Sequence, residues 1–308
     1  MSVACVFPGQ GSQSVGMLKA LSEQYPEVVS TFADASDALG EDLWALVCNG
    51  PSEALNQTEK TQPAMLAAGI AVYRCYRRQA AAPAFAAGHS LGEITALVAA
   101  GAIDFKAAIS LVHTRGRLMQ AAVPAPQGAM AAILMLADDL VIQACAESAQ
   151  GQVVEAVNFN CPGQVVIAGH AEAVERAMEA CKAKGAKRAL RLPVSVPAHS
   201  SLLKHAAEQF REVLAPVAIA VPEFKVCALE GQWHSDGERI KEQLVAQLWQ
   251  PVRWTHTITR LAQLGADRFL ECGPGKVLTG LNKKIPSSQG HGCAAIEDPD
   301  SLSAAWSA

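Results

Sequence analysis

Two short apolar runs, each followed by a glycine-containing turn, constrain the fold of this chain more than any other feature. The first run, Val3–Phe7, leads into the turn Pro8–Ser12. The second run, Phe85–Ala87, leads into Gly88–Gly92 and then a helical pattern over Glu93–Ala100. Buried strands that alternate with helices are typical of a mostly parallel sheet. We therefore predict an α/β fold.

The pattern changes between residues 127 and 196. There we predict strands over Ala129–Leu136, Val153–Phe159, Gln164–Gly169 and Ala186–Val196, and helices over Asp138–Ala149 and Ala171–Lys184. This β-α-β-β-α-β order is typical of a ferredoxin-like domain. Alternation then resumes with Ser200–Leu214, Phe224–Leu229, Glu238–Leu248 and Phe269–Glu271. We predict a large domain of residues 1–126 and 197–308 with residues 127–196 inserted as a small domain. The tail from Ser287 shows little pattern, and we expect it to be loosely held.

Composition excludes several classes of protein. The chain has 308 residues, 50% of them apolar and 18% charged, and its net charge of −4 provides no overall positive field for nucleic acid or an anionic membrane. Nine cysteines without zinc-site spacing indicate free thiols in a reducing compartment. No secretory signal and no apolar run of about 18–20 residues is present. We expect a cytoplasmic protein.

The spacing Gly88-x-Ser90-x-Gly92 matches a nucleophile elbow, in which a sharp strand-to-helix turn exposes a serine. Ser90 would then lie at a helix N-terminus, where the amide of Leu91 and the positive end of the helix dipole stabilise an oxyanion. A glycine-rich turn with a serine helix cap gives the same pattern. The strand before and the helix after favour the nucleophile.

A serine hydroxyl needs a base, and eight histidines are candidates. His170 and His199 each follow a predicted strand, and the sequence pattern leaves both open. His89 is too close in sequence to face Ser90. The others lie in a helix or in surroundings typical of a surface position: His113, His205, His234, His256 and His291. No acidic third member is evident, so we expect a neutral group to orient the base.

Arg115 is the clearest indication of substrate. It falls within the apolar stripe of a predicted helix over Phe105–Ala122, whereas Arg117 falls outside it. A guanidinium on a buried face suits a carboxylate held at two points, and an internal ion pair is the alternative. The turn Pro8–Ser12 lacks the Lys-Ser/Thr ending of a phosphate-binding loop, but its backbone could serve an oxyanion hole.

Six motifs occur in one order along the chain: Phe7–Gln13, Thr61–Ala64, Gly88–Glu93, His113–Gly116, Val157–Asn160 and Glu271–Gly275. Together with the ferredoxin-like insert, they closely resemble the bacterial malonyl-CoA:acyl-carrier-protein transacylase family, from Val3 to about Ile285. The resemblance implies an α/β-hydrolase-like large subdomain with a parallel sheet, a ferredoxin-like (βαββαβ) small subdomain, and a site in the gorge between them.

The resemblance also implies roles for individual residues. Ser90 would carry a malonyl ester, and His199 is selected over His170 as its base because Pro193–His199 matches the family's histidine segment. The remaining roles are the malonyl carboxylate partner Arg115, the oxyanion-hole amides of Gln10 and Leu91, and the supporting residues Gln247, through a backbone acceptor, and Gln62. The implied reaction is ping-pong transfer of malonyl from malonyl-CoA to the phosphopantetheine thiol of holo acyl carrier protein, for fatty acid synthesis, without a metal or cofactor.

Other functions on this fold remain open. An acyltransferase of polyketide synthesis or malonate decarboxylation would use the same chemistry with another carrier. A serine esterase or thioesterase would share Ser90 and His199 without needing Arg115, and a binding protein would need none of the three. We expect a monomer whose partners are malonyl-CoA and the carrier. Because carriers are acidic, one basic cluster is a candidate docking surface: Lys182, Lys184, Lys187, Arg188 and Arg191.

Overall fold

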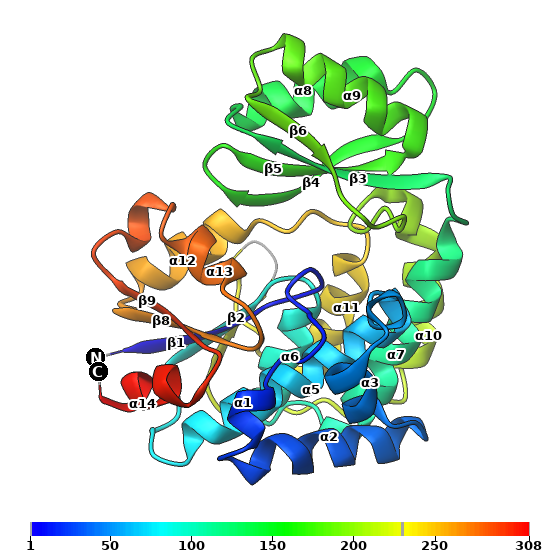
Figure 1. The fold of residues 1–308 in the computed structure, drawn as a ribbon. Helices are drawn as coiled ribbons and strands as arrows, with labels where there is room; N and C mark the ends of the chain where they lie inside the picture. The colour runs from blue at the N-terminus through cyan, green and yellow to red at the C-terminus, as the bar shows by residue number, and fades with distance from the viewer. Residues whose placement is uncertain (1, 229–230, 308) are drawn as a thin grey trace. The chain divides into compact units, whose positions relative to one another are not determined.

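The computed structural model describes residues 2–228 and 231–307 (Figure 1). They divide into two compact units. The first unit runs to Gly116 and includes Val213–Lys241 and the chain from Thr257 onward, and the second comprises Arg117–Glu212 and Glu242–His256. The elements predicted between residues 127 and 196 all lie in the second unit. Their separation as a domain with those boundaries stays a prediction.

A five-stranded sheet forms the centre of the first unit, in the order β7-β2-β1-β8-β9. Its strands are β1 (Val3–Phe7), β2 (Phe85–Gly88), β7 (Lys225–Cys227), β8 (Arg268–Cys272) and β9 (Gly292–Ile296). Every neighbouring pair is parallel. Residues 4–7 of the central strand are fully buried, as expected for a strand covered on both faces. The predicted parallel α/β fold is confirmed.

Helices make up most of the rest of the first unit. They are α1 (Lys19–Ser22), α2 (Pro26–Leu39), α3 (Leu43–Asn49), α4 (Ser52–Leu55), α5 (Thr58–Arg77), α6 (Leu91–Ala99), α13 (Val277–Asn282) and α14 (Pro299–Ser307). Four more contain a boundary between the units: α7 (Phe105–Ala122), α10 (Lys204–Leu214), α11 (Gly237–Gln247) and α12 (Trp254–Gln263). No pattern in the sequence predicted α5. Its residues are buried around almost the whole circumference, so no amphipathic stripe marks it.

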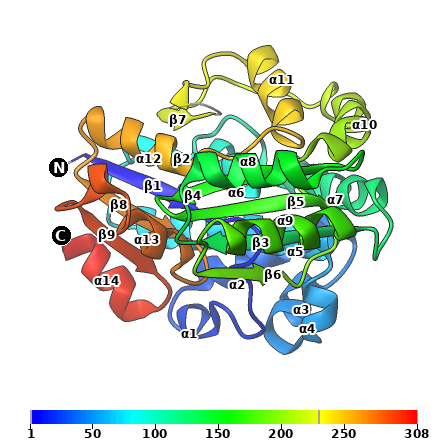
Figure 2. The same cartoon turned by 90° about the horizontal axis from the view of Figure 1, so that it is seen from above.

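The second unit contains a four-stranded antiparallel sheet in the order β4-β5-β3-β6. Its elements are β3 (Gly128–Leu134), α8 (Asp138–Ser148), β4 (Val154–Cys161), β5 (Gln164–His170), α9 (Ala171–Ala183) and β6 (Arg188–Arg191). Both views show α8 and α9 side by side over one face of this sheet (Figures 1 and 2). Apolar residues of β3, α8 and α9 form the core between the sheet and the two helices. The predicted ferredoxin-like order is confirmed, although β6 is shorter than predicted.

The C-terminal segment is ordered, so the expectation of a loosely held tail is wrong. Strand β9 completes the parallel sheet, and α14 follows it. Leu302 is fully buried, and the indole of Trp306 donates a hydrogen bond of 2.8 Å to the carbonyl of Tyr76. A short edge strand and a single short helix give too little periodicity to recognise from sequence. Of the predicted strand Phe224–Leu229, the structure shows Lys225–Cys227, and Leu229 lies outside the described residues.

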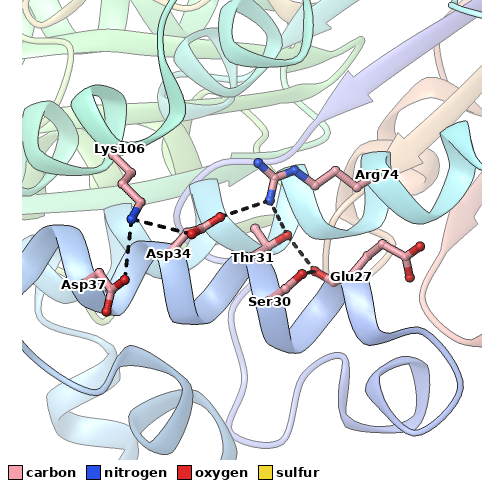
Figure 3. A network of polar contacts seen from close by, with 7 residues as sticks. All are labelled: Glu27, Ser30, Thr31, Asp34, Asp37, Arg74 and Lys106. Carbon is pink, nitrogen blue, oxygen red and sulfur yellow. Dashed lines mark hydrogen bonds and ion pairs between the residues drawn. The ribbon is translucent and has the colours of Figure 1, made fainter.

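A polar network joins α2 to α5 and α7 (Figure 3). Arg74 of α5 donates to the hydroxyl of Thr31 at 2.8 Å and lies 3.7 Å from the carboxylate of Asp34. Lys106 of α7 lies 3.6 Å from Asp34 and 3.5 Å from Asp37. The network therefore ties α2 to both helices, α5 and α7, that contribute the side chains described next.

Candidate active site

Ser90 lies at the turn between β2 and α6, as predicted. Its backbone has φ 54° and ψ −114°, an unfavourable conformation for a residue with a Cβ and one found at nucleophile elbows. The flanking glycines allow the strand and the helix to approach each other. A Cβ on Gly88 would lie 1.7 Å from the carbonyl carbon of Gly92, and a Cβ on Gly92 would lie 2.0 Å from the carbonyl oxygen of Phe7. The two glycines are therefore required by backbone packing.

The turn after β1 runs beside this elbow. A Cβ on Gly9 would lie 2.6 Å from the carbonyl oxygen of His89 and 3.8 Å from the amide nitrogen of Leu91. Gln10 follows Gly9, and its side chain donates to the hydroxyl of Thr58 at 3.4 Å. Gln10 and Leu91 thus lie on neighbouring turns at the carboxyl ends of two adjacent parallel strands, where α/β sheets place their sites.

Arg115 of α7 reaches this elbow. Its side chain is buried, with 1% of the residue exposed. Its Nη1 donates to Oε1 of Gln62, on α5, at 2.9 Å, and its Nη2 lies 3.5 Å from Oγ of Ser90. Burial lowers the pKa of the Arg115 guanidinium to about 10, and the negative charge of Glu93 partly opposes that shift. The site therefore places a desolvated cation beside the serine hydroxyl.

His199 lies in the second unit, in the segment before α10. It is 3% exposed and has a positive φ of 65°. Its Nδ1 lies 2.7 Å from the backbone carbonyl oxygen of Gln247, and its own amide donates to the carbonyl of Leu248 at 3.0 Å. A carbonyl only accepts, so Nδ1 carries the proton and Nε2 of the neutral ring carries the lone pair. A neutral backbone group thus orients this imidazole.

Three further hydrogen bonds hold the turn that carries His199. The hydroxyl of Ser200 donates to the carbonyl of Pro197 at 2.7 Å. The amide and the hydroxyl of Ser201 donate to the two carboxylate oxygens of Glu155, on β4, at 2.7 and 2.8 Å. Glu155 was not among the predicted site residues, because nothing local in the sequence shows that a strand residue contacts a turn 46 positions later.

The remaining histidines include one correction. His170, the other candidate base, accepts a hydrogen bond at Nδ1 from the amide of Val153 at 2.9 Å and so has a structural contact. His234 was predicted to lie at the surface, and that prediction is wrong. Its side chain is fully buried, with Nε2 2.8 Å from Oε1 of Glu93. An irregular, polar segment can still pack against a core, so local polarity did not show the burial of His234.

The structure thus describes two sets of residues, one in each unit. In the first unit, Ser90 lies with Arg115 and Gln62, and the turns of Gln10 and Leu91 run side by side. In the second unit, His199 is oriented by Gln247. Within residues 2–228 and 231–307, no group of three or more His, Cys, Asp or Glu side chains is arranged to hold a metal ion. Over the same residues, no helix is long and apolar enough to span a membrane.

The candidate docking cluster is largely neutralised by nearby carboxylates. Lys182 lies 2.7 Å from Glu179 and Lys184 lies 3.0 Å from Glu147. Arg191 forms an ion pair with Glu175. Lys187 and Arg188, at the start of the edge strand β6, are exposed and form no ion pair within the part of the chain that the structure describes.

Comparison with known proteins places this chain in one class of enzyme. Residues 4–295 match the family described as acyl transferase domain, so the chain is an acyltransferase. It belongs to the bacterial malonyl CoA-acyl carrier protein transacylase family. The member from Escherichia coli is 53% identical over 304 residues, which cover 98% of each chain, and that from Bacillus subtilis is 43% identical over 97% of this chain and 95% of the relative.

Solved structures agree with this assignment. The acyl carrier protein S-malonyltransferase of Vibrio cholerae superposes with a TM-score of 0.95 at 53% identity, covering 99% of each chain. A malonyl-transacylase solved in complex with its type II PKS acyl-carrier protein superposes with a TM-score of 0.97 at 52% identity, covering 100% of this chain and 99% of the other. The predicted family, fold class and enzyme class are therefore confirmed.

Proposed function

We propose that this enzyme transfers a malonyl group from malonyl-CoA to the phosphopantetheine thiol of holo acyl carrier protein, through a malonyl ester on Ser90. One observation carries the proposal: the buried guanidinium of Arg115 lies 3.5 Å from the hydroxyl of Ser90. An acyl group on that hydroxyl that ends in a second carboxylate would meet a cation able to bind it at two points. The names of the relatives support the same donor and acceptor.

The first half-reaction loads the serine. Oγ of Ser90 attacks the thioester carbonyl while Nε2 of His199 takes its proton. The carbon–sulfur bond breaks, and the leaving thiolate of coenzyme A takes the proton from the imidazolium. In the second half-reaction the carrier's thiol gives its proton to His199 and attacks the ester. The carbon–oxygen bond to Ser90 breaks, and the serine regains its proton.

Fixed dipoles stabilise the charges that develop. The carbonyl of Gln247 accepts from Nδ1 of His199 and so stabilises the imidazolium without an acidic partner. The amides of Gln10 and Leu91, together with the N-terminus of α6, supply an oxyanion hole. Gln62 fixes one arm of the Arg115 fork, which leaves the orientation of the guanidinium defined before substrate arrives.

Arg115 also supports this function over hydrolysis and acetyl transfer. An acetyl group would leave the guanidinium without its carboxylate in a desolvated site, which disfavours that substrate. A serine esterase or thioesterase would have no use for a buried cation at the acyl end. The pathway is part of the proposal: we assign fatty acid synthesis in the cytoplasm, carried out by a monomer. A polyketide carrier is the second candidate, because one relative at 52% identity is paired with such a carrier.

Intact-protein mass spectrometry tests the proposal. The enzyme is mixed briefly with malonyl-CoA or with acetyl-CoA, and holo acyl carrier protein is then added. We expect a malonyl adduct that forms selectively, moves to the carrier, and is absent in Ser90→Ala. Ser14→Ala, a change at an exposed serine, is the matched control and should keep the adduct. An adduct that persists in Ser90→Ala, or malonate released to water faster than transfer, would contradict the proposal.

A further inference from the structure

A buried acid and a buried histidine lie beside the nucleophile helix, and the mechanism above uses neither of them. Glu93 is 4% exposed and His234 is 6% exposed. Oε1 of Glu93 accepts a hydrogen bond from Nε2 of His234 at 2.8 Å. Burying an ionised carboxylate costs free energy unless the carboxylate is paired or hydrogen-bonded, so the hydrogen bond from His234 stabilises Glu93 in this buried position.

Both residues are fixed to the elements that present Ser90. Glu93 lies in the first turn of α6, and its amide donates to the carbonyl of Ser90 at 3.0 Å. The amide of His234 donates to the carbonyl of Val226, in β7, at 3.1 Å. Strand β7 pairs with β2, the strand that ends at the elbow. The pair therefore has little freedom to move away from the site.

Glu93 is also related to Arg115 by charge. A buried guanidinium needs a negative charge nearby. Among the residues that the structure describes, two glutamates are buried, Glu93 and Glu271. Glu271 accepts hydrogen bonds from the amides of Leu278 and Thr279 at 3.0 and 2.7 Å and so caps α13. Glu93 is the one whose negative charge acts on Arg115. Both residues also contact Ser90, through Nη2 of Arg115 at 3.5 Å from its hydroxyl and through the amide of Glu93 at 3.0 Å from its carbonyl. Glu93 is therefore the buried acid best placed to balance Arg115 when no substrate is bound.

We propose that Glu93 and His234 are positioning residues that set how strongly Arg115 binds the malonyl carboxylate; this inference rests on the proposed function. Without substrate, Glu93 balances the guanidinium. Once malonyl binds, two carboxylates share one guanidinium. The hydrogen bond from His234 stabilises the charge of Glu93 at that point, so Glu93 competes less strongly with the substrate for Arg115.

Steady-state kinetics with malonyl-CoA and acetyl-CoA test this role. In His234→Ala, Glu93 depends more on Arg115, so we expect the KM for malonyl-CoA to rise and the malonyl-to-acetyl ratio of kcat/KM to fall about tenfold. His234→Gln keeps an N–H donor at a similar reach and should stay within about twofold of wild type. In a Glu93→Gln background the neutral side chain no longer competes, so adding His234→Ala should change the ratio less than about twofold.

A merely structural role predicts a different pattern. In that case His234→Ala would lower the activity with malonyl-CoA and with acetyl-CoA in parallel. Alternatively, His234→Ala would change the malonyl-to-acetyl ratio equally with and without Glu93→Gln. Either result overturns the inference. If His234→Ala does not fold, His234→Gln and His234→Asn are compared instead, because the asparagine side chain is too short to donate to Glu93. Equal malonyl-to-acetyl ratios of kcat/KM in these two variants would also overturn the inference. Arg115→Ala separates the two proposals. If it keeps malonyl selectivity, the proposed function fails; if it loses selectivity while His234→Ala keeps it, only this inference fails.

Discussion

At the scale of single residues, the nucleophile depends on two glycines as much as on the serine. A methyl group at residue 92 would meet the carbonyl oxygen of Phe7 at 2.0 Å, and only a shift of the backbone could relieve that contact. We predict that Gly92→Ala lowers the free energy of unfolding by more than about 3 kcal/mol, measured by urea denaturation. Gly280→Ala is the matched control. A Cβ there has no neighbour within 4 Å, and we expect a neutral or slightly stabilising change. A stable Gly92→Ala enzyme would contradict the packing argument.

Arg115 should determine acyl selectivity. Removing its guanidinium removes the partner of the malonyl carboxylate, and it also removes the buried cation that disfavours an acetyl group. We predict that Arg115→Ala reduces the malonyl-to-acetyl ratio of kcat/KM by at least about tenfold. Arg117→Ala removes an exposed arginine from the same helix and should leave the ratio within about twofold. Equal ratios in the two variants would exclude the role assigned to Arg115.

The same residue predicts a pH dependence. Only the protonated guanidinium pairs with a carboxylate, and burial lowers the pKa of Arg115 to about 10, below its ordinary value. The charged form therefore persists through neutral pH and is lost as pH rises through the lowered pKa. We predict a malonyl-to-acetyl ratio that is constant between about pH 6 and about pH 9 and falls above that range. Taking the ratio cancels titration of the shared base. A ratio that falls already below about pH 8 would contradict this assignment.

Sequence identified the residues whose signal is local. Ser90 is marked by its own flanking glycines, and Arg115 by its place in the apolar stripe of its helix. Glu93 and His234 meet across 141 positions, and neither lies in a local pattern that indicates burial. Chemistry that depends on such pairs becomes visible only when the fold brings the partners together.

At the scale of elements, the network in Figure 3 should contribute little to stability. Arg74, Asp34 and Lys106 have side chains that are 38%, 44% and 51% exposed, so water and salt screen their ion pairs. We predict that Asp34→Asn lowers the free energy of unfolding by less than about 1 kcal/mol, and by less still in about 1 M salt. Urea denaturation at two salt concentrations measures this. A loss that persists in high salt would show that Asp34 acts through packing or hydrogen bonding instead.

Helix α14 should be an integral part of the first unit. Leu302 is fully buried, so Leu302→Ala removes apolar contacts and leaves a cavity. We predict a loss of about 2–4 kcal/mol in the free energy of unfolding. The neighbouring Ser303→Ala, at an exposed position, should change it by less than about 0.5 kcal/mol. Equal stability of the two variants would mean that α14 contributes little to folding.

The elements that the sequence predicted well have a clear local signal, either a glycine or proline turn at one end or a regular spacing of apolar residues. Strands β1 and β2 end at glycine turns, and α7 has an apolar stripe over its whole predicted length. Helix α5 lacks such a signal because it is buried on nearly all sides, and β9 is a short strand at the edge of the sheet. Packing against distant parts of the chain stabilises α5 and β9, and the local spacing of apolar residues does not show that packing.

At the scale of the whole molecule, the net charge of −4 opposes the approach of an acidic carrier, so docking needs local positive charge. The original five-residue cluster reduces to Lys187 and Arg188, because Lys182, Lys184 and Arg191 already pair with carboxylates. We predict that the double variant Lys187→Glu with Arg188→Glu slows transfer to the carrier about tenfold at low salt. Formation of the malonyl adduct from malonyl-CoA should stay unchanged.

The matched control for docking is Lys182→Glu with Lys184→Glu, which changes the net charge by the same amount. Its two cations are already balanced by Glu179 and Glu147, so a local docking role predicts a smaller effect on transfer. Transfer rates are measured over a range of salt concentrations. If Lys187 and Arg188 contact the carrier, the difference in transfer rate between their variant and wild type should shrink as salt screens the charges. If both double variants slow transfer equally, overall charge repels the carrier and Lys187 and Arg188 have no special part. If neither does, the carrier approaches over another surface.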